Sequence, residues 1–378
     1  MVTLKGAFVE HFSVIEDPRI DRKRLHNFQD ILVITLCAVI CGADTWENIS
    51  NFGRAKYDWF KTFLELQNGI PSHDTLCRVF SLIDPLQFEN CFIEWMRACV
   101  ELCAGSIVPI DGKRLRSSHG RHSPNKSSIH MVSAFSSANG LVLGQRKIDD
   151  KSNEITAIPK LLETLYLKGC IVTIDAMGCQ KDIAEKIAEQ KADYVLALKG
   201  NQGSLFADVK LYLDSIISGE IKNIPYQTVE TVEKGHGRVE ERNYYITEAI
   251  DWLPNKELWA NLKGIGVVES RRHIDGVTSS ERRYFITSIT ANADKFSKAV
   301  REHWSIENNL HWTLDVAFGD DAAKTYAGDA AENLGIVRRI AYNLVKQDKK
   351  KASIKGKRLI AGWDNAYLMH LLSELLNF

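Results

Sequence analysis

The sequence of 378 residues has no excess of charge of either sign, because 48 Lys and Arg residues balance 48 Asp and Glu residues. Its global charge therefore indicates no polyanionic partner, and only the local distribution of charge is informative. None of the eight cysteines forms a Cys-x-x-Cys motif, and no pair of histidines follows them at the spacing of a zinc finger. We expect the cysteines to be small buried side chains in a reducing compartment.

Long hydrophobic runs are also missing. The longest run, from Ile31 to Cys41, is too short to cross a bilayer, which requires about 20 residues, and it predicts a buried helix. Lys5, Glu10 and His11 interrupt the start before an apolar segment forms, so we expect no signal peptide. With 45% apolar and 25% charged residues, the composition is that of a globular protein and excludes collagen-like and disordered chains. At about 150 residues per domain, the length predicts two or three domains.

Residues 1–104 have the apolar spacing of helices. Within Trp46–Leu66, apolar residues recur at intervals of three and four. Ser72 follows the turn Gly69-Ile70-Pro71 and is a candidate helix N-cap. The predicted helices are Ile31–Ile40, Trp46–Leu66, His73–Leu82 and Leu86–Cys103.

From residue 105 onward, short apolar strands replace the helical pattern. Asn139-Gly140 lies between two of them and is the signal of a tight hairpin. Three successive strands followed by alternating helices and strands predict an α/β fold, a mixed sheet with helices packed on it. The predicted elements are strands Ile107–Ile110, Ile129–Phe135 and Leu141–Ile148, helix Asn153–Leu167, strand Cys170–Ile174, helix Gln180–Gln190 and strand Tyr194–Leu198.

Residues 200–291 return to short strands and turns, and helices follow to the C-terminus. The predicted strands are Thr228–Val232, Arg242–Thr247, Gly264–Arg271 and Arg283–Ile289, and the predicted helices are Asp294–Leu314, Ala330–Lys346 and Asn365–Leu375. We therefore divide the chain into an all-α N-terminal domain (1–104), a first part of the α/β core (105–199), a β-rich insertion (200–291) and a second part of the core with C-terminal helices (292–378).

Two segments of this neutral chain are strongly basic. Residues 112–147 contain seven basic residues and no acidic one, and residues 338–358 contain nine basic residues with Asp348 as their one acid. Such segments favour a polyanion such as nucleic acid. A solvated surface face is the alternative explanation for each of them.

Two carboxylates stand directly after apolar strands. Asp111 follows Ile107–Ile110, and Asp175 follows Cys170–Ile174. If the two strands are neighbours, the carboxylates converge, and converging carboxylates are usually held by a divalent metal ion. A single aspartate after a strand is otherwise a common turn or cap residue.

A third acid lies on the helix predicted for Asp294–Leu314. His303, Glu307 and His311 are four residues apart and therefore share one face of that helix. Two strand-end aspartates and a helical glutamate would hold two Mg²⁺ or Mn²⁺ ions about 3.5–4 Å apart, the geometry for in-line attack on a phosphodiester. The histidines with Glu307 also suggest zinc, but no His-Glu-x-x-His motif occurs, and magnesium is favoured. Glu307 as an ordinary surface residue is a further alternative.

Several motifs occur in a fixed order and together resemble a known family. They are Val108-Pro109-Ile110-Asp111-Gly112-Lys113, Val172-Thr173-Ile174-Asp175-Ala176-Met177, Tyr194-Val195-Leu196-Ala197-Leu198-Lys199-Gly200-Asn201-Gln202, His303-Trp304-Ser305-Ile306-Glu307-Asn308, Leu310-His311-Trp312-Thr313-Leu314-Asp315-Val316 and Asp320-Asp321. Their order and spacing are similar to those of the H-repeat-associated (ISAs-type) group of bacterial insertion-sequence DDE transposases, over nearly the whole chain.

This resemblance implies an RNase H-like core with a DDE triad, in which Asp111, Asp175 and Glu307 are the catalytic and metal-binding residues. Residues 200–291 then match the β-rich insertion of related hairpin-forming transposases. Residues 1–104 match a helical domain that helps to recognise the DNA ends, and within it we predict a unit similar to a helix-turn-helix over Trp46–Leu82.

The activity implied by the resemblance is Mg²⁺-dependent hydrolysis of a phosphodiester at the ends of the element, followed by strand transfer through transesterification. The implied partners are double-stranded DNA, as terminal inverted repeats and as target, and further copies of the chain in a homodimer or larger synaptic complex. No membrane partner is expected, and the implied location is the bacterial cytoplasm, at the nucleoid.

The sequence departs from the family signature around the glutamate. Val300, His303 and Leu314 stand where the broader family has Tyr, Arg and Lys. Protonated His303 would still contact phosphate, and His311 or Lys324 would replace the missing lysine. The other candidate DNA contacts are Lys113, Arg114 and Arg116 after the first aspartate, Lys199, Asn201 and Gln202 after the strand Tyr194–Leu198, and His236 and Arg238 at a hairpin tip. A plain turn is the alternative for the last two groups.

Two other functions are compatible with the sequence. One is an RNase H-like, structure-specific DNA nuclease that cuts without strand transfer. The other is a catalytically inactive, sequence-specific DNA-binding relic of a mobile element, which the intact acidic triad disfavours and the departures at Val300 and Leu314 favour. A zinc hydrolase is a more distant alternative.

Overall fold

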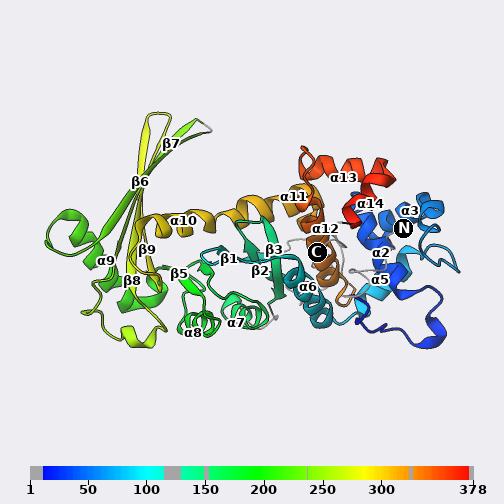
Figure 1. The fold of residues 1–378 in the computed structure, drawn as a ribbon, viewed down its shortest axis with the longest axis horizontal. Helices are drawn as coiled ribbons and strands as arrows, with labels where there is room; N and C mark the ends of the chain where they lie inside the picture. The colour runs from blue at the N-terminus through cyan, green and yellow to red at the C-terminus, as the bar shows by residue number, and fades with distance from the viewer. Residues whose placement is uncertain (1–11, 115–128, 149–152, 236, 323–326, 374–378) are drawn as a thin grey trace.

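The computed structural model describes residues 12–114, 129–148, 153–235, 237–322 and 327–373. Within them the chain forms a nine-stranded mixed sheet flanked by helices, with a helical bundle at one end (Figure 1). The predicted fold class, a mixed sheet with helices packed on it, is therefore confirmed. In the described ranges, every helix is too short or too polar to cross a membrane.

The N-terminal region is helical, and its central helix is buried on all sides. α2 (Phe28–Ile40) begins at Asn27, whose side chain accepts hydrogen bonds from the backbone N–H groups of Gln29 and Asp30. Every residue of α2 except Gln29 is buried, as expected for a helix that is apolar around its whole circumference. The other elements here are η1 (Asp21–Lys23), α3 (Trp46–Ala55), α4 (Tyr57–Phe60), α5 (His73–Leu82) and α6 (Pro85–Cys99).

The predicted helix-turn-helix unit over Trp46–Leu82 is wrong. Residues 61–72 separate α4 from α5, whereas the turn of such a unit has about three or four residues. The single helix predicted for Trp46–Leu66 is also divided, into α3 and α4, and it ends at Phe60. Leu66 has a positive φ of 42°, and Pro71 precedes the N-cap of α5, so neither residue favours a helix between α4 and α5. α5 does begin at the predicted cap, because the side chain of Ser72 accepts a hydrogen bond from the N–H of Thr75.

A single sheet runs through the predicted core and the predicted insertion. Its strand order is β3-β2-β1-β4-β5-β9-β8-β7-β6. β1, β4 and β5 are parallel to one another, and all other neighbours are antiparallel, including β5 and β9, which join the two parts. The strands are β1 (Ile107–Arg114), β2 (His130–Ser136), β3 (Leu141–Lys147), β4 (Ile171–Ile174), β5 (Asp193–Leu198), β6 (Gln227–Gly235), β7 (Arg238–Thr247), β8 (Gly264–Ile274) and β9 (Val277–Thr287).

Helices cover both faces of this sheet. α7 (Glu154–Thr164), α8 (Lys181–Glu189) and α9 (Gly203–Ser218) pack on one face, and α10 (Ala293–His303) packs on the other. The sequence prediction missed α9, because residues 200–226 were expected to form strands and turns. Val209, Leu213 and Ile216 recur at intervals of four and three residues and bury one face of α9.

The single helix predicted for Asp294–Leu314 is interrupted. α10 ends at His303, a π-helical segment η4 follows over Ile306–His311, and α11 (Trp312–Phe318) continues from it. Short π-helical turns are frequent at functional sites. Here the segment carries Glu307.

The N-terminal and C-terminal helices share one hydrophobic core. α12 (Ala330–Gln347) packs against α2, α5 and α6, and apolar residues from Phe12 to Leu372 belong to the same cluster. Figure 1 shows the blue N-terminal and the orange and red C-terminal helices side by side. The remaining elements are η5 (Asp320–Ala322), α13 (Ile354–Trp363) and α14 (Asn365–Ser373). The residues predicted as an N-terminal domain are therefore packed directly on the last helices of the chain.

Candidate active site

Asp111 and Asp175 are neighbours on the central parallel strands. Ile110 of β1 is paired with Ile174 of β4, and the next residue of each chain segment is the aspartate. Adjacent strands lie about 4.8 Å apart, so residues in register leave the sheet close together and on the same face. The buried apolar residues that precede both aspartates fix the two backbones.

Glu307 reaches the same place from the π-helical segment. Together with Asp111 and Asp175 it lines a cavity of about 310 Å³, to which Lys199 and Trp304 also contribute. The side chain of Asp111 is 18% exposed, whereas Glu307 is on the surface. The structure thus brings the three acids of the predicted triad to one cavity that is open to a ligand.

A fourth carboxylate, Glu154, was missed from the sequence. It is the first residue of α7, after the N-cap Asn153. A side chain at position 112 would overlap the carboxylate of Glu154, so Gly112 provides the space that this group fills beside Asp111. The sequence signal was available, as an acid in the first turn of a helix and a glycine directly after the first aspartate of the predicted triad, but neither is specific.

Two of the four acids, Asp111 and Glu154, have raised pKa values. Burial, followed by the charges of Glu154, Glu307 and Asp175, raises the pKa of Asp111 to about 7, against a hydrogen bond from the Gly112 backbone. Burial and the charge of Asp175 also raise the pKa of Glu154. Repulsion of this kind between carboxylates is typical of sites that bind a cation or hold a proton.

Asp175 is oriented by the loop that follows it. Its Oδ1 accepts hydrogen bonds from the backbone N–H groups of Met177 and Gly178, at 3.0 and 3.3 Å. The amides of Asn201 and Gln202 donate to the carbonyl oxygens of Ala176 and Cys179, at 2.7 and 2.6 Å. Asn201 and Gln202, which were predicted as DNA contacts, therefore brace the loop of the second aspartate.

Comparison with known protein families identifies the chain. Residues 9–96 match the family described as DDE_Tnp_1-associated, and residues 103–344 match the Transposase DDE domain. The chain belongs to the DDE transposase family.

Individual relatives agree with this assignment. The "H repeat-associated putative transposase YhhI" of Escherichia coli (strain K12) is 44% identical over 371 residues, which cover 97% of each chain. The "Putative transposase YncI" of Escherichia coli O157:H7 is 43% identical over 373 residues, 97% of this chain and 95% of that one. A piggyBac transposase, solved as a synaptic complex with hairpin DNA, covers all of this chain and 78% of its own at 12% identity. Its TM-score of 0.41 is too low to support an argument.

Burial disfavours the protonated form of the two histidines near the triad of this DDE transposase family member. Burial lowers the pKa of His303, against the charge of Asp175, and its Nδ1 is 3.0 Å from the hydroxyl of Thr173. Burial and the charge of Lys113 lower the pKa of His311 to about 3, and its Nδ1 lies 3.6 Å from Asp111. Both shifts oppose the positive charge with which these rings were predicted to contact phosphate, and their contact with DNA stays a prediction.

The basic residues predicted to contact DNA differ in how far they are exposed. Lys113 is buried and paired with Asp315, whereas Arg114 and Lys199 are exposed, and Lys199 lines the cavity of the triad. Arg116, His236 and Lys324 lie outside the described residues. Arg238 is exposed at the start of β7.

Much of the charge in the two basic segments is internal to the protein. Arg146 and Lys147 pair with Glu89 and Glu332, at 2.8 and 3.2 Å. In the C-terminal segment four basic side chains are buried: Arg338, Arg339, Lys357 and Arg358. Neither segment is therefore a wholly exposed polyanion-binding face, because a count of charges along the chain says nothing about their burial.

The acids of this DDE family member do not form a closed metal cage. Within the described ranges, no three His, Cys, Asp or Glu side chains are close enough to hold a metal ion. Among the same residues, Asp111, Asp175 and Glu307 make no ion pair with a lysine or arginine. Their charges are thus available to a cation that arrives with the substrate.

Proposed function

We propose that this chain is an active DNA transposase that cleaves a phosphodiester at the ends of its element and transfers the strand to target DNA. One observation carries the proposal: Asp111 and Asp175 directly follow Ile110 and Ile174, which are paired on the adjacent strands β1 and β4, and Glu307 lines the same cavity as both aspartates. The mixed sheet β3-β2-β1-β4-β5, with Asp111 on one central strand and Asp175 directly after the next, supports an RNase H-like core. Because two ends must be joined, we propose that the working form is a homodimer or a larger assembly on double-stranded DNA.

The chemistry of these residues suits a divalent cation, which would have to draw together carboxylates that are too far apart, among the described residues, to hold an ion as they stand. Carboxylate oxygens are the ligands that Mg²⁺ and Mn²⁺ prefer, and the crowding of carboxylates raises the pKa of Asp111 to about 7, with burial as the largest cause. Asp111, Asp175 and Glu307 would hold the ions, and Glu154 stands beside them. When bound, two ions would activate the attacking hydroxyl and stabilise the leaving oxygen.

The chain's own residues supply orientation. The hydrogen bonds from Met177 and Gly178 hold the Asp175 carboxylate, and Asn201 and Gln202 hold that loop. Lys199 and Arg114, both exposed, are proposed to contact the DNA backbone. Lys113, His303 and His311 have partners within the protein, and their proposed contribution is to fix the geometry around Asp111 and Asp175.

The proposal is tested with a labelled duplex that covers the DNA flanking the gene. Wild type is expected to nick one end of the element in Mg²⁺ and not in EDTA, and Asp175→Asn to bind the duplex without nicking it. A second duplex with a pre-cut end tests strand transfer into a plasmid. Nicking without transfer would replace the proposal by the nuclease, and binding without nicking in wild type would replace it by the inactive relic.

We expect Asn201→Ala to slow cleavage by about 10- to 100-fold, because a small displacement of a catalytic group has a large kinetic cost. Its affinity for DNA, measured in EDTA by fluorescence anisotropy, should stay at the wild-type value. Lys199→Gln, two residues away, should instead weaken binding. If Asn201→Ala loses affinity and keeps its single-turnover rate, Asn201 contacts DNA and does not position Asp175.

A further inference from the structure

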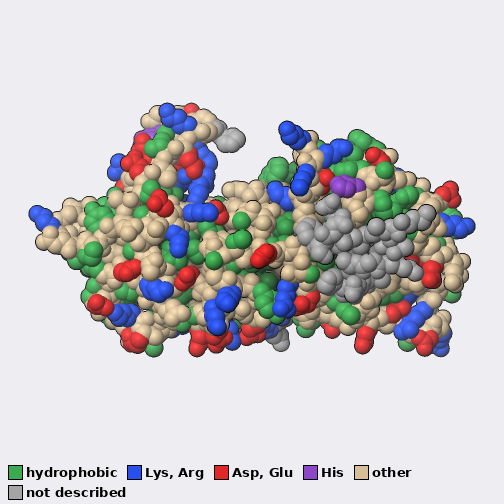
Figure 2. All heavy atoms as spheres, in the orientation of Figure 1, with side chains coloured by type: hydrophobic (Ala, Val, Ile, Leu, Met, Phe, Trp, Pro, Cys, Tyr) green, Lys and Arg blue, Asp and Glu red, His purple; other side chains and the backbone are tan. Residues whose placement is uncertain are grey.

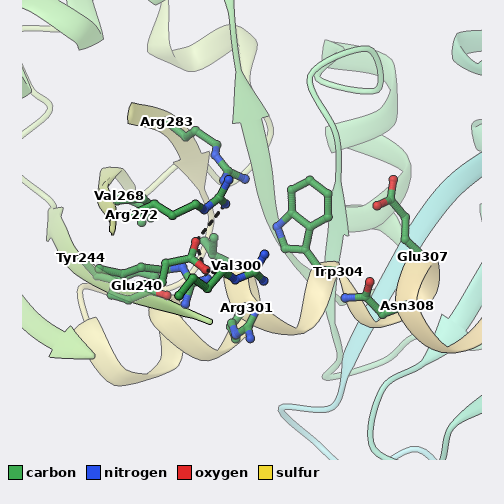
Figure 3. Close-up of a pocket in the computed structure, with 13 residues that line it drawn as sticks. Glu240, Tyr244, Val268, Arg272, Arg283, Val300, Arg301, Trp304, Glu307 and Asn308 are labelled. Atoms are coloured by element: carbon green, nitrogen blue, oxygen red, sulfur yellow. Dashed lines mark hydrogen bonds and ion pairs between the residues drawn. The ribbon is translucent and has the colours of Figure 1, made fainter. Parts of the chain in front are cut away.

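A second cavity adjoins the active site and is lined by arginines. It has a volume of about 260 Å³ and lies between one face of β7, β8 and β9 and the C-terminal end of α10 (Figure 3). Five of its thirteen lining residues are arginines, and we call it the arginine pocket. They are Arg238, Arg242, Arg272, Arg283 and Arg301.

Strand alternation places these side chains on one face of the sheet. In the pairing of β7 with β8, Glu240 is opposite Arg272 and Arg242 is opposite Ser270. In the pairing of β8 with β9, Val268 is opposite Arg283. Residues two apart on a strand share a face of the sheet. The side chains of β7, β8 and β9 that line the pocket therefore all point to the face on which α10 lies.

Two carboxylates hold four of the guanidinium groups in place. Glu240 is 3% exposed and lies 2.7 Å from Arg242 and 3.1 Å from Arg272. Arg238 is 3.8 Å from the same carboxylate. Glu233 binds Arg301 through both oxygens, at 2.9 and 2.7 Å. The arginines are therefore ordered before any ligand arrives, which lowers the entropic cost of binding one.

The pairing leaves positive charge and N–H donors unused. The side chain of Arg242 is 10% exposed, and its Nη1 makes no hydrogen bond within the described residues, although Glu233 is 3.2 Å away. Nε of Arg272 is likewise buried without an acceptor there. Arg283 pairs with the exposed Glu281 at 3.4 Å, and its guanidinium lies 5.2 Å from the ring of Trp304. Buried donors of this kind normally have an acceptor, so the pocket is suited to an anion.

The arginine pocket is continuous with the cavity of the triad. Arg283, Val300, Trp304 and Glu307 line both. In Figure 3, Trp304 lies between the guanidinium groups of Arg272 and Arg283 on one side and Glu307 on the other. Figure 2 shows the molecule hollowed between the projecting strands and the C-terminal helices, with Lys and Arg side chains on both sides. An anion bound in the arginine pocket would therefore lie next to a ligand bound at Asp111, Asp175 and Glu307.

We propose that the arginine pocket binds a backbone phosphate of the DNA strand whose adjacent phosphodiester is cleaved at Asp111, Asp175 and Glu307. Planar guanidinium groups bind phosphate oxygens in pairs, and arginine is the side chain best suited to this. The inference rests on the proposed function and adds a substrate contact to it. It would also add guanidinium groups near the triad, where the family signature has an arginine and a lysine and this chain has His303 and the buried Leu314.

The test compares two pairs of substitutions on the same two strands. Arg272→Gln with Arg283→Gln removes two cations from the arginine pocket. Arg271→Gln with Arg282→Gln is the matched control, because these neighbours lie on the opposite face, where both pair with Glu269. Binding of the labelled flanking duplex is measured by anisotropy in EDTA over a series of salt concentrations, and melting temperatures check that all variants are folded.

We expect the pocket pair to weaken binding by about tenfold and to reduce the slope of log K against log salt by about one to two, one for each lost phosphate contact. The control pair should stay within about twofold of wild type. Arg283→Gln alone disrupts one exposed ion pair and should show part of the loss of affinity. This single variant replaces the pocket pair in the test if the double variant does not fold.

Three results would overturn the arginine pocket as a phosphate site. The pocket pair and the control pair could lose the same affinity, the salt slope could be unchanged, or the pocket pair could cleave and bind as wild type does. In each of these cases wild-type cleavage that Asp175→Asn abolishes would leave the proposed function intact. Absence of any wild-type binding to the flanking duplex would instead overturn both.

Discussion

Asp111→Asn is expected to abolish DNA cleavage and, in the same protein, to raise the melting temperature when no divalent cation is present. The loss of activity should be at least about 100-fold, because Asp111 is proposed to hold the cation that stabilises the transition state, and even groups that only support a metal ligand contribute about 10- to 100-fold. The gain in stability follows from the crowding of acids. Burial and the charges of Glu154, Glu307 and Asp175 raise the pKa of Asp111 to about 7.

The sign of the pH dependence follows from that pKa. The folded protein keeps a proton on Asp111 up to about pH 7, whereas the unfolded chain loses it near pH 4, so this group lowers stability progressively between these values. A shift of three pKa units lowers the free energy of unfolding by at most about 4 kcal/mol, and this limit is reached above pH 7. The advantage of Asp111→Asn in EDTA should therefore be largest near pH 8 and vanish near pH 4.

Thermal melts with and without Mg²⁺ check this prediction. At about pH 8 the cation should raise the melting temperature of wild type, because it binds the folded state alone, and should raise that of Asp111→Asn much less. A variant that melts below wild type in EDTA at that pH would show that the Asp111 carboxylate is stabilised within the protein. A variant that still cleaves would remove Asp111 from the triad.

Asp320→Asn is expected to lower the free energy of unfolding by about 3–5 kcal/mol, the cost of breaking a buried ion pair from one side. The Asp320 carboxylate is fully buried, 3.0 Å from Arg338, 4.0 Å from Arg339 and 3.9 Å from Lys113. Burial alone would raise the pKa of Asp320, but the charges of Arg339 and Arg338 lower it. The asparagine would remove this counter-charge from the buried Arg338 and Arg339, whereas Lys113 would keep its pair with Asp315.

Urea unfolding of the whole chain measures this loss. Asp315→Asn is the matched control, because Asp315 also pairs with Lys113 but has a side chain that is 36% exposed, and it should cost about 0–1 kcal/mol. If Asp320→Asn costs no more than this control, the buried cations have other acceptors, and the cluster contributes little to stability.

The sequence predicted the parts of the site that depend on local pattern. Asp111 and Asp175 were found because an acid directly after an apolar strand is conspicuous, and the parallel pairing of β1 and β4 makes them neighbours. Glu307 was found through its motif, although its helix contains an unpredicted π-helical turn. The strands of the β-rich region were predicted. The helix α9 was missed, because its few apolar residues at helical spacing lie in a segment whose pattern is otherwise that of short strands and turns.

The remainder depends on tertiary contacts that no local pattern contains. Glu154 reaches Asp111 only because α7 begins beside Gly112. Arg272 and Arg283 line one pocket because β8 and β9 are antiparallel neighbours and both side chains lie on the same face of the sheet. Charge counting along the chain treated Arg338 and Arg339 as candidates for a polyanion site, whereas both are buried against Asp320. The sequence shows which residues carry charge, but it does not show which side chains they contact in the folded protein.

The shared core of α2 and α12 has a consequence for how the chain leaves the ribosome. Nearly every side chain of α2 is buried, and α12, which covers part of it, is synthesised some 300 residues later. During translation the first helices therefore keep an apolar surface exposed until almost the whole polypeptide has emerged, a state prone to aggregation. A copy of the gene truncated before α12 would yield an insoluble product. It would not yield a free N-terminal fragment that competes with the intact protein for DNA.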